Sequence, residues 1–450
     1  MSGSTRREFL GAVAAGAALA AQEPGERPAP PPGGVKVLNP RARVPLSFII
    51  DDSCCLVNLA HFCIPQFAEV NPEAYRQDWR KLPREIPDAF VRKFMEWCRE
   101  HGVKGKYSIV PYPACVGWID REMPGWTRKE LEESLRLVRE FVAPNWDIHP
   151  EMVTHTWGID TRTGRPYPDR TAANMENWGF SVGKSVDFLA DYIAYALRLL
   201  KNVGLPCEGV TTPGGFGSRV MPAFSKATLL ACRDVYGTDV AHYFRDLYTD
   251  HRSVAPLVQW ASGLETDDPR CVVSVIGCTG DWTGGWDGLE EPAPDKFITE
   301  DLQGGRLPEV IARGEPAILV CHWPGIYHNG DEAGFKAFRT VVGRLEARYR
   351  NLLWMKSGEI ARYWAARECT AIRREGGRIE FRAPFACPSF TVELEAPPQA
   401  VPRLLVGDRP VALREVDDLL RLEAGTWSRA ANGVAICFDL PKGACRVELG

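Results

Sequence analysis

The chain has 450 residues, of which 45% are hydrophobic and 25% are charged, and its formal net charge at pH 7 is −4. These proportions are those of an ordinary globular enzyme, and the length leaves room for two or more domains. The slightly negative charge argues against a nucleic-acid-binding protein, which would normally carry a basic patch. Beyond the start of the chain, no apolar run reaches the roughly 20 residues that a membrane-spanning helix needs.

The N-terminus has the pattern of a twin-arginine export signal. Arg6 and Arg7 are followed by Phe9, an alanine-rich stretch and the small residues Ala18 and Ala20, which suit a cleavage site. We expect residues 1–21 to be a signal peptide for the twin-arginine export machinery, leaving no stable membrane span after its removal. The protein is then expected in the periplasm or outside the cell. Residues 22–43 are rich in proline and are expected to form an extended tether.

Strand-like and helix-like patterns alternate over residues 44–367. Strands are predicted at 44–50, 105–111, 151–157, 209–212, 271–276, 317–322 and 352–355, and helices at 88–99, 127–141, 186–202, 224–235 and 334–348. The second of these helices is predicted to begin after Thr127, with Glu130 at the capping-box position. This alternation indicates an α/β fold with a parallel sheet, most simply a distorted (β/α) barrel.

The C-terminal region, residues 368–450, follows a different pattern. Apolar and polar residues alternate with a period of two, and turn signals such as Gly376-Gly377 and Asn432-Gly433 separate the runs. This pattern predicts a small antiparallel β-sandwich, which we expect to brace the main domain rather than to bind carbohydrate. Most of the 14 cysteines are expected to be buried apolar residues, although Cys437 and Cys445 could face each other across a hairpin.

Three segments carry the chemistry. They are Phe48–Ser53, Thr154–Trp157 and Ala317–His322, and each is a β-prone or apolar run ending in residues that bind metals or move protons. In a barrel of parallel strands, the carboxyl ends of the strands meet on one face, so these residues should converge. Two adjacent aspartates and two histidines suggest metal-assisted hydrolysis.

These segments resemble, in sequence and order, the motifs of the polysaccharide deacetylase family, the carbohydrate esterases related to chitooligosaccharide deacetylase. The resemblance covers roughly residues 44–364. It implies that Asp51 is the general base, that Asp52 and His155 bind the metal, and that His322 is the general acid. It also implies a divalent metal ion, with Zn²⁺ as the default expectation.

The sequence departs from the family pattern at two places. The family has a second histidine ligand four residues after the first, where this chain has Ile159, so Asp160 is the expected third ligand, with His61 and His149 as alternatives. The family also has an arginine that orients the base, and the corresponding stretch here, Val210–Gly215, contains none.

Four residues near the expected site are candidates for substrate contact. Trp157 and Trp323 follow the predicted strands, Trp282 lies in a glycine-rich loop with Trp286, and Thr212 opens a glycine-rich turn. The tryptophans could stack on a sugar ring, and backbone N–H groups of the turn could stabilise an oxyanion.

The sequence therefore predicts an exported, metal-dependent hydrolase that removes N-acetyl or O-acetyl groups from a polysaccharide or glycan. One alternative is a carbohydrate-binding protein that kept the fold and lost turnover. Another is a glycoside hydrolase, for which Asp281 and Asp287 are the obvious pair of carboxylates.

Overall fold

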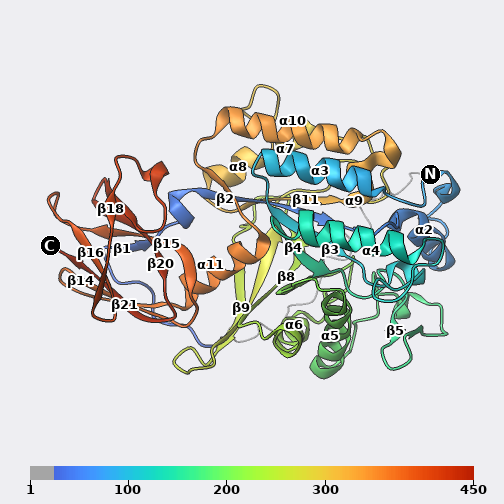
Figure 1. The fold of residues 1–450 in the computed structure, drawn as a ribbon, viewed down its shortest axis with the longest axis horizontal. Coiled ribbons are helices and arrows are strands. Elements are labelled where there is room, and N and C mark those ends of the chain that lie inside the picture. The colour runs from blue at the N-terminus through green and yellow to red at the C-terminus, as the bar shows by residue number, and fades with distance from the viewer. Residues whose placement is uncertain (1–24) are drawn as a thin grey trace, which may run out of the picture.

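The computed structural model describes residues 25–450, and the predicted signal peptide therefore lies outside the described residues. Figure 1 shows two regions: a larger one of strands with helices around them, and an all-β region at the C-terminal end. No helix of residues 25–450 is long and apolar enough to cross a membrane.

The first sheet of the larger region is entirely parallel. Its order is β11-β2-β3-β4, and β12 also pairs with β2. The strands are β2 (Val44–Asp51), β3 (Gly105–Ile109), β4 (Trp146–Pro150), β11 (Ala317–His322) and β12 (Leu352–Trp354). All eight residues of β2 are buried, as expected of a parallel strand that is covered on both faces.

The second sheet has the order β7-β8-β10-β9, and only β9 runs antiparallel to its neighbour. The strands are β7 (Gly209–Thr211), β8 (Val240–Leu247), β9 (Leu257–Ser262) and β10 (Arg270–Gly277). The two sheets approach each other at both edges. Glu151, just after β4, forms a single bridge to Thr211 of β7, and Cys278 N donates to Ile318 O of β11 at 2.8 Å.

The main helices lie outside these strands, which confirms the predicted α/β arrangement of parallel strands and external helices. They are α2 (Leu59–Val70), α3 (Asp88–Glu100), α4 (Arg128–Leu137), α5 (Val186–Asn202), α6 (Met221–Tyr236), α8 (Arg306–Ala312) and α10 (Ala333–Arg348), with short α7 (Pro294–Phe297) and α9 (Trp323–Tyr327). Figure 1 shows α3 and α10 on one side of the strands and α5 and α6 on the other. The predicted capping box at the start of α4 is confirmed, because Thr127 and Glu130 bond reciprocally.

The C-terminal region consists of two five-stranded sheets, which agrees with the predicted all-β domain. Their orders are β1-β15-β20-β19-β18 and β13-β14-β21-β16-β17, and all pairs except β18–β19 are antiparallel. The strands are β1 (Val35–Val37), β13 (Ala371–Glu375), β14 (Arg378–Ala383), β15 (Cys387–Glu395), β16 (Pro402–Val406), β17 (Arg409–Val411), β18 (Arg414–Glu415), β19 (Thr426–Ala430), β20 (Gly433–Leu440) and β21 (Gly443–Leu449). Helix α11 (Ser357–Cys369) connects the two regions and packs against β8, β10 and β15.

Cys437 and Cys445 do not face each other across a hairpin. Cys437 lies in β20 and Cys445 in β21, which are consecutive strands but belong to different sheets. Both thiols are free, and both side chains are buried. The bulk of the cysteines are buried apolar residues, as the sequence predicts.

The stretch expected to be a tether is packed against the rest of the chain. The Glu26 carboxylate accepts hydrogen bonds from the N–H groups of Gly263 and Leu264, both at 2.9 Å. Strand β1 pairs with β15, and its Val37 is only 7% exposed. This differs from the expected tether because two valines in β1 give the segment an apolar surface that the sheet can bury.

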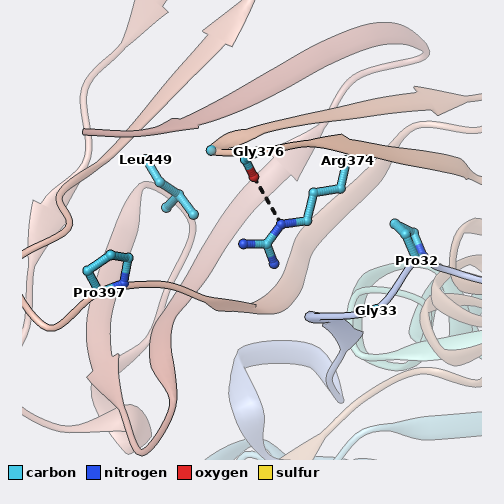
Figure 2. Close-up of a pocket in the computed structure, with 7 residues that line it drawn as sticks. Pro32, Gly33, Arg374, Gly376, Pro397 and Leu449 are labelled. Carbon is cyan, nitrogen blue, oxygen red and sulfur yellow. Dashed lines mark hydrogen bonds between the residues drawn. The ribbon is translucent and has the colours of Figure 1, made fainter.

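A pocket lies where this N-terminal stretch meets the C-terminal region. Figure 2 shows Arg374 between Pro32 and Gly33 on one side and Pro397 and Leu449 on the other. Its guanidinium donates to three carbonyl oxygens, those of Gly34, Gly376 and Glu395, at 2.7–3.1 Å. Arg374 therefore ties strands together here, and none of the candidate catalytic residues lines this pocket.

Candidate functional site

The side chains of Asp52, Glu151 and His155 converge at the carboxyl ends of β2 and β4. His155 Nε2 lies 2.7 Å from Asp52 Oδ1 and 3.5 Å from Glu151 Oε1. Each of the three residues is at most 4% exposed. Two carboxylates and an imidazole within reach of one point form a donor set that suits a divalent metal.

The electrostatics of this group favour an added positive charge. Burial opposes the imidazolium form of His155, but the Asp52 and Glu151 carboxylates outweigh it and raise its pKa well above the usual value. Asp52 Oδ1 has no partner with hydrogen-bond geometry although it is buried. His155 Nε2 lies 2.7 Å from this oxygen without the alignment of a hydrogen bond, and a bound metal ion would satisfy the oxygen fully.

The backbone at this site is held in an uncommon conformation. Asp52 has a φ of 59° and His155 a φ of 67°, both in the left-handed region that non-glycine residues rarely adopt. Each is fixed by a carboxylate: Asp52 N donates to Glu151 Oε2 at 2.8 Å, and His155 N donates to Glu176 Oε2 at 2.6 Å. Strain of this kind persists only where the surroundings hold it, as at functional sites.

Glu176 orders the segment that carries His155. Its fully buried carboxylate accepts hydrogen bonds from the N–H groups of Val153, Thr154 and His155 at 2.6–3.2 Å and from the Tyr192 hydroxyl. Burial raises the pKa of Glu176 to about 7, against these hydrogen bonds, which lower it. Sequence reasoning missed Glu176 because an isolated glutamate in a loop carries no signal of its partners.

Asp51 lies beside this group and is paired with a buried lysine. Lys106 of β3 is fully buried, and its ammonium donates to Asp51 Oδ1, to Ser108 Oγ at 2.8 Å and to Ile50 O at 3.2 Å. Burial raises the pKa of Asp51 to about 6, although the Lys106 charge acts in the opposite direction. Lys106 thus supplies a cation beside the expected base, where the sequence lacks the family's arginine. A lysine inside an otherwise buried strand was the signal that could have revealed it.

His322 ends β11 directly beside Asp51, its register partner in β2. Its Nδ1 lies 2.9 Å from Asp281 Oδ2, and its side chain is 28% exposed, more than those of Asp51 and the three residues of the metal group. Burial opposes protonation, but the Asp52, Asp281 and Asp51 carboxylates raise the pKa of His322 to about 10. The imidazolium form is therefore the one present near neutral pH.

Asp160 does not join the metal-binding group, which corrects the expected third ligand. It lies in β5 (Ile159–Asp160), which pairs with β6 (Arg165–Pro166), and its Oδ1 accepts from Arg162 N at 2.9 Å and Nε at 3.3 Å. The pairing of β5 with β6 places Asp160 in the turn where it meets Arg162. Glu151, four residues before His155, is the third member of the metal-binding group in place of Asp160.

The two alternative third ligands also lie elsewhere. His61 Nδ1 is 2.9 Å from Leu82 O and the ring packs edge-on against Trp79, so His61 is a satisfied structural residue. His149 is the fourth of the five residues of β4, and its Nε2 lies 2.8 Å from His242 Nε2 instead.

Two of the four predicted substrate contacts are packed in the protein. Trp323 is fully buried among Phe90, Phe94 and Tyr107, and Trp157 is 3% exposed with the Arg170 guanidinium 4.7 Å from its ring centroid. Neither tryptophan ring has a free face for a sugar. Their positions at predicted strand ends suggested substrate contact, but both side chains pack inside the protein.

Of the other two predicted contacts, Trp282 is the more accessible. Trp282 is half-buried and packs edge-on against Phe297 at 5.0 Å between ring centroids. Thr212 is 8% exposed, and its buried Oγ1 has no hydrogen-bond partner among the described residues.

A group of aromatic side chains adjoins His155. Phe67 of α2 lies 6.2 Å from His155 between ring centroids and contacts Trp178 at 5.5 Å and Trp286 at 5.8 Å, while Tyr75 packs on the same ring. Tyr75, Trp178 and Trp286 are half-buried. We call these three residues with Phe67 the aromatic group. The sequence placed only Trp286 near a substrate, since Tyr75 and Trp178 come from separate loops.

Comparison with known proteins finds similar structures but no similar sequence. No protein-family model and no curated protein matches the chain. A probable polysaccharide deacetylase from Pseudomonas aeruginosa PAO1 is similar over 72% of this chain and 91% of its own, with 10% identity and a TM-score of 0.39. A putative glycoside hydrolase/deacetylase from Parabacteroides distasonis is similar over 79% and 82%, with 10% identity and a TM-score of 0.38.

A Puue allantoinase is similar over 72% of this chain and 91% of its own, with 13% identity and a TM-score of 0.36. At such identities and TM-scores the likeness says nothing about chemistry, which has to come from the geometry of the site.

Proposed function

We propose that the protein is a metal-dependent hydrolase that removes acetyl groups from a polysaccharide or glycan. The observation that carries the proposal is the position of the Asp52, Glu151 and His155 group beside a buried carboxylate, Asp51, whose neighbour on β11 is a protonated imidazole, His322. A metal site flanked by a base and an acid is the arrangement that hydrolysis of an acyl bond requires.

Asp52, Glu151 and His155 would hold the metal ion, with zinc as the first choice for two carboxylates and an imidazole. When bound, such an ion would supply Lewis-acid polarisation of the acyl oxygen and lower the pKa of a water molecule. Asp51, with a pKa of about 6, is ionised at neutral pH and would accept a proton from the attacking water.

His322 would then donate its proton to the leaving amine or alkoxide. Asp281 orients this transfer because its Oδ2 lies 2.9 Å from Nδ1, which leaves Nε2 to meet the substrate. The Asp281 carboxylate also raises the pKa of His322, so the imidazolium keeps its proton until it is transferred to the leaving group.

The aromatic group supports a carbohydrate substrate. Half-buried Tyr75, Trp178 and Trp286 form a rigid apolar surface near the metal group. Such rings bind the apolar face of a pyranose at a low entropic cost. Trp282 and Thr212 remain proposed contacts.

We further propose that the two sheets of the larger region form one distorted barrel. The bridge between Glu151 and Thr211 and the hydrogen bond from Cys278 N to Ile318 O support closure at both edges. Export by the twin-arginine machinery to the periplasm or the cell exterior remains a proposal that rests on the sequence of residues 1–21.

The glycoside hydrolase alternative has less support. Asp281 is engaged by His322 and by Thr283 Oγ1 at 2.7 Å, and Asp287 is 3% exposed and accepts from Gln77 Nε2 at 3.0 Å. Neither carboxylate is left to flank a glycosidic bond.

Asp51→Asn separates the hydrolase from the binding-protein alternative. A hydrolase should lose at least about 100-fold of its acetate release from acetylated glycans, since a general base contributes 10²–10⁴-fold. Its metal content and glycan affinity should stay at the wild-type level. A wild-type protein that binds acetylated glycan but releases no acetate would leave the binding protein as the better account.

A further inference from the structure

A second group of metal-binding side chains lies along β4 and β8, before the strand ends that carry the first group. Asp147 and His149 alternate along β4 on the same face as Glu151, and His242 comes from β8. At about 3.3 Å per residue, Asp147 is roughly 13 Å along the chain from Glu151. Among residues 25–450, this group and the group around His155 are the clusters in which three such ligand atoms lie within 4.8 Å of one another.

The two imidazoles point at each other. His149 Nε2 lies 2.8 Å from His242 Nε2, and Asp147 Oδ2 lies 4.0 Å from the same His242 atom. Both histidines are at most 1% exposed.

The other nitrogen of His149 has its own partner. Nδ1 lies 3.3 Å from Thr211 Oγ1 at the end of β7. Metal-binding histidines are commonly held by such a contact at the second ring nitrogen, which fixes the tautomer and presents the free lone pair to the metal.

The backbone around the group leaves space for these side chains. A Cβ on Gly209 of β7 would lie 2.6 Å from His242 Nε2 and 2.7 Å from His149 Nε2. A Cβ on Gly358, in the first turn of α11, would lie 3.1 Å from both His242 Cε1 and Asp147 Oδ2. Glycine at both positions allows the imidazoles to meet across β7 and α11 to approach them.

We propose that Asp147, His149 and His242 form a second divalent-cation site, suited to zinc, with a structural role. Two imidazoles and a carboxylate are a common zinc donor set. The ion would tie β4, β8 and the start of α11 together, because the Gly358 N–H donates to Asp147 Oδ2. This inference does not depend on the proposed hydrolase function, since it uses none of the same side chains.

Zinc content after saturation with Zn²⁺ and dialysis tests the site in the full mature chain. Four proteins decide it: wild type, Asp52→Asn/His155→Gln to block the first group, His242→Gln, and the combination of all three changes. His101→Gln is the matched control, because this half-buried histidine belongs to neither group and contacts Glu346 and the Trp97 ring. Circular dichroism checks that each protein is folded.

The blocked variant should retain one zinc ion per chain, and the triple variant should retain none. The zinc ion in the blocked variant should shift its melting temperature upward, and His101→Gln should match wild type in both measurements. If His242→Gln does not fold, Asp147→Asn replaces it, and the blocked variant alone still decides. A folded blocked variant that binds no zinc overturns the proposal and shows that the histidines form only an N–H···N hydrogen bond.

Discussion

Lys106 donates a hydrogen bond to Asp51 inside the first sheet, and the two side chains are respectively 0% and 8% exposed. Burying a lysine ammonium costs free energy unless an opposite charge lies beside it. Here the Asp51 carboxylate compensates for the buried charge of Lys106, and the lysine does the same for the carboxylate. The pair puts a positive charge beside Asp51 and holds its carboxylate by a hydrogen bond.

Replacing Lys106 with methionine should damage both stability and activity. Loss of one partner from a buried ion pair typically costs about 3–5 kcal/mol in the free energy of unfolding. Without the lysine charge the pKa of Asp51 should rise above about 6, so the rate should fall off at a higher pH on the acidic side. Urea unfolding and the pH dependence of kcat/KM measure the two effects.

Lys104→Met is the matched control, because Lys104 pairs with Glu359 at 3.6 Å on the surface. It should change the free energy of unfolding by no more than about 1 kcal/mol. Equal losses in the two variants would contradict a special role for the buried pair.

The corrected third ligand predicts opposite outcomes for two acidic residues. Glu151→Gln should remove the metal ion bound at the first group and reduce acetate release to background, because Glu151 lies 3.5 Å from His155 Nε2. Asp160→Asn should leave metal content and rate within about twofold of wild type, since Asp160 is paired with Arg162. Elemental analysis and an acetate assay compare them, and the reverse outcome would restore Asp160 as the ligand.

The activity should depend on pH as a bell with two identifiable limbs. The reaction needs Asp51 ionised, which occurs above its pKa of about 6, and His322 protonated, which holds below its pKa of about 10. Asp281→Asn removes a carboxylate that stabilises the imidazolium, so the alkaline limb of kcat should move to lower pH while the acidic limb stays. An alkaline limb that does not move would exclude Asp281 as the partner that holds the proton on His322.

Glu176→Gln should weaken metal binding, although Glu176 is not itself a member of the metal-binding group. The Glu176 carboxylate accepts hydrogen bonds from backbone N–H groups and so holds His155 in its left-handed conformation. The glutamine amide would place its own N–H donors against these backbone N–H groups. Loss of such a supporting contact typically lowers metal affinity about 10–100-fold. Competition with a zinc chelator measures it, and Glu132→Gln on the exposed face of α4 should behave as wild type. A Glu176 variant with unchanged zinc affinity would refute this positioning role.

Much of the arrangement could be predicted from local sequence. The apolar run of β2 followed by Asp51 and Asp52, and the run of β11 followed by His322, have to bring these side chains to one edge, because parallel strands align their ends. The strand–helix alternation and the capping box at Thr127 have equally local causes.

The rest depends on contacts between distant segments. Glu151 and Asp160 are equally good ligands by type, and only the pairing of β5 with β6 turns Asp160 away. Lys106 and Glu176 acquire their roles from partners about 55 and 21 residues away along the chain. Trp323 follows a strand end like a substrate contact, yet α3 places Phe90 and Phe94 against it.

The most direct measurement is the divalent metal content of the mature protein and of His155→Ala, together with acetate release from acetylated glycans. The account predicts that the variant loses one equivalent of metal relative to wild type and loses acetate release with it. Equal metal content in the two proteins after saturation with zinc would contradict a metal site at Asp52, Glu151 and His155 and the hydrolysis that depends on it.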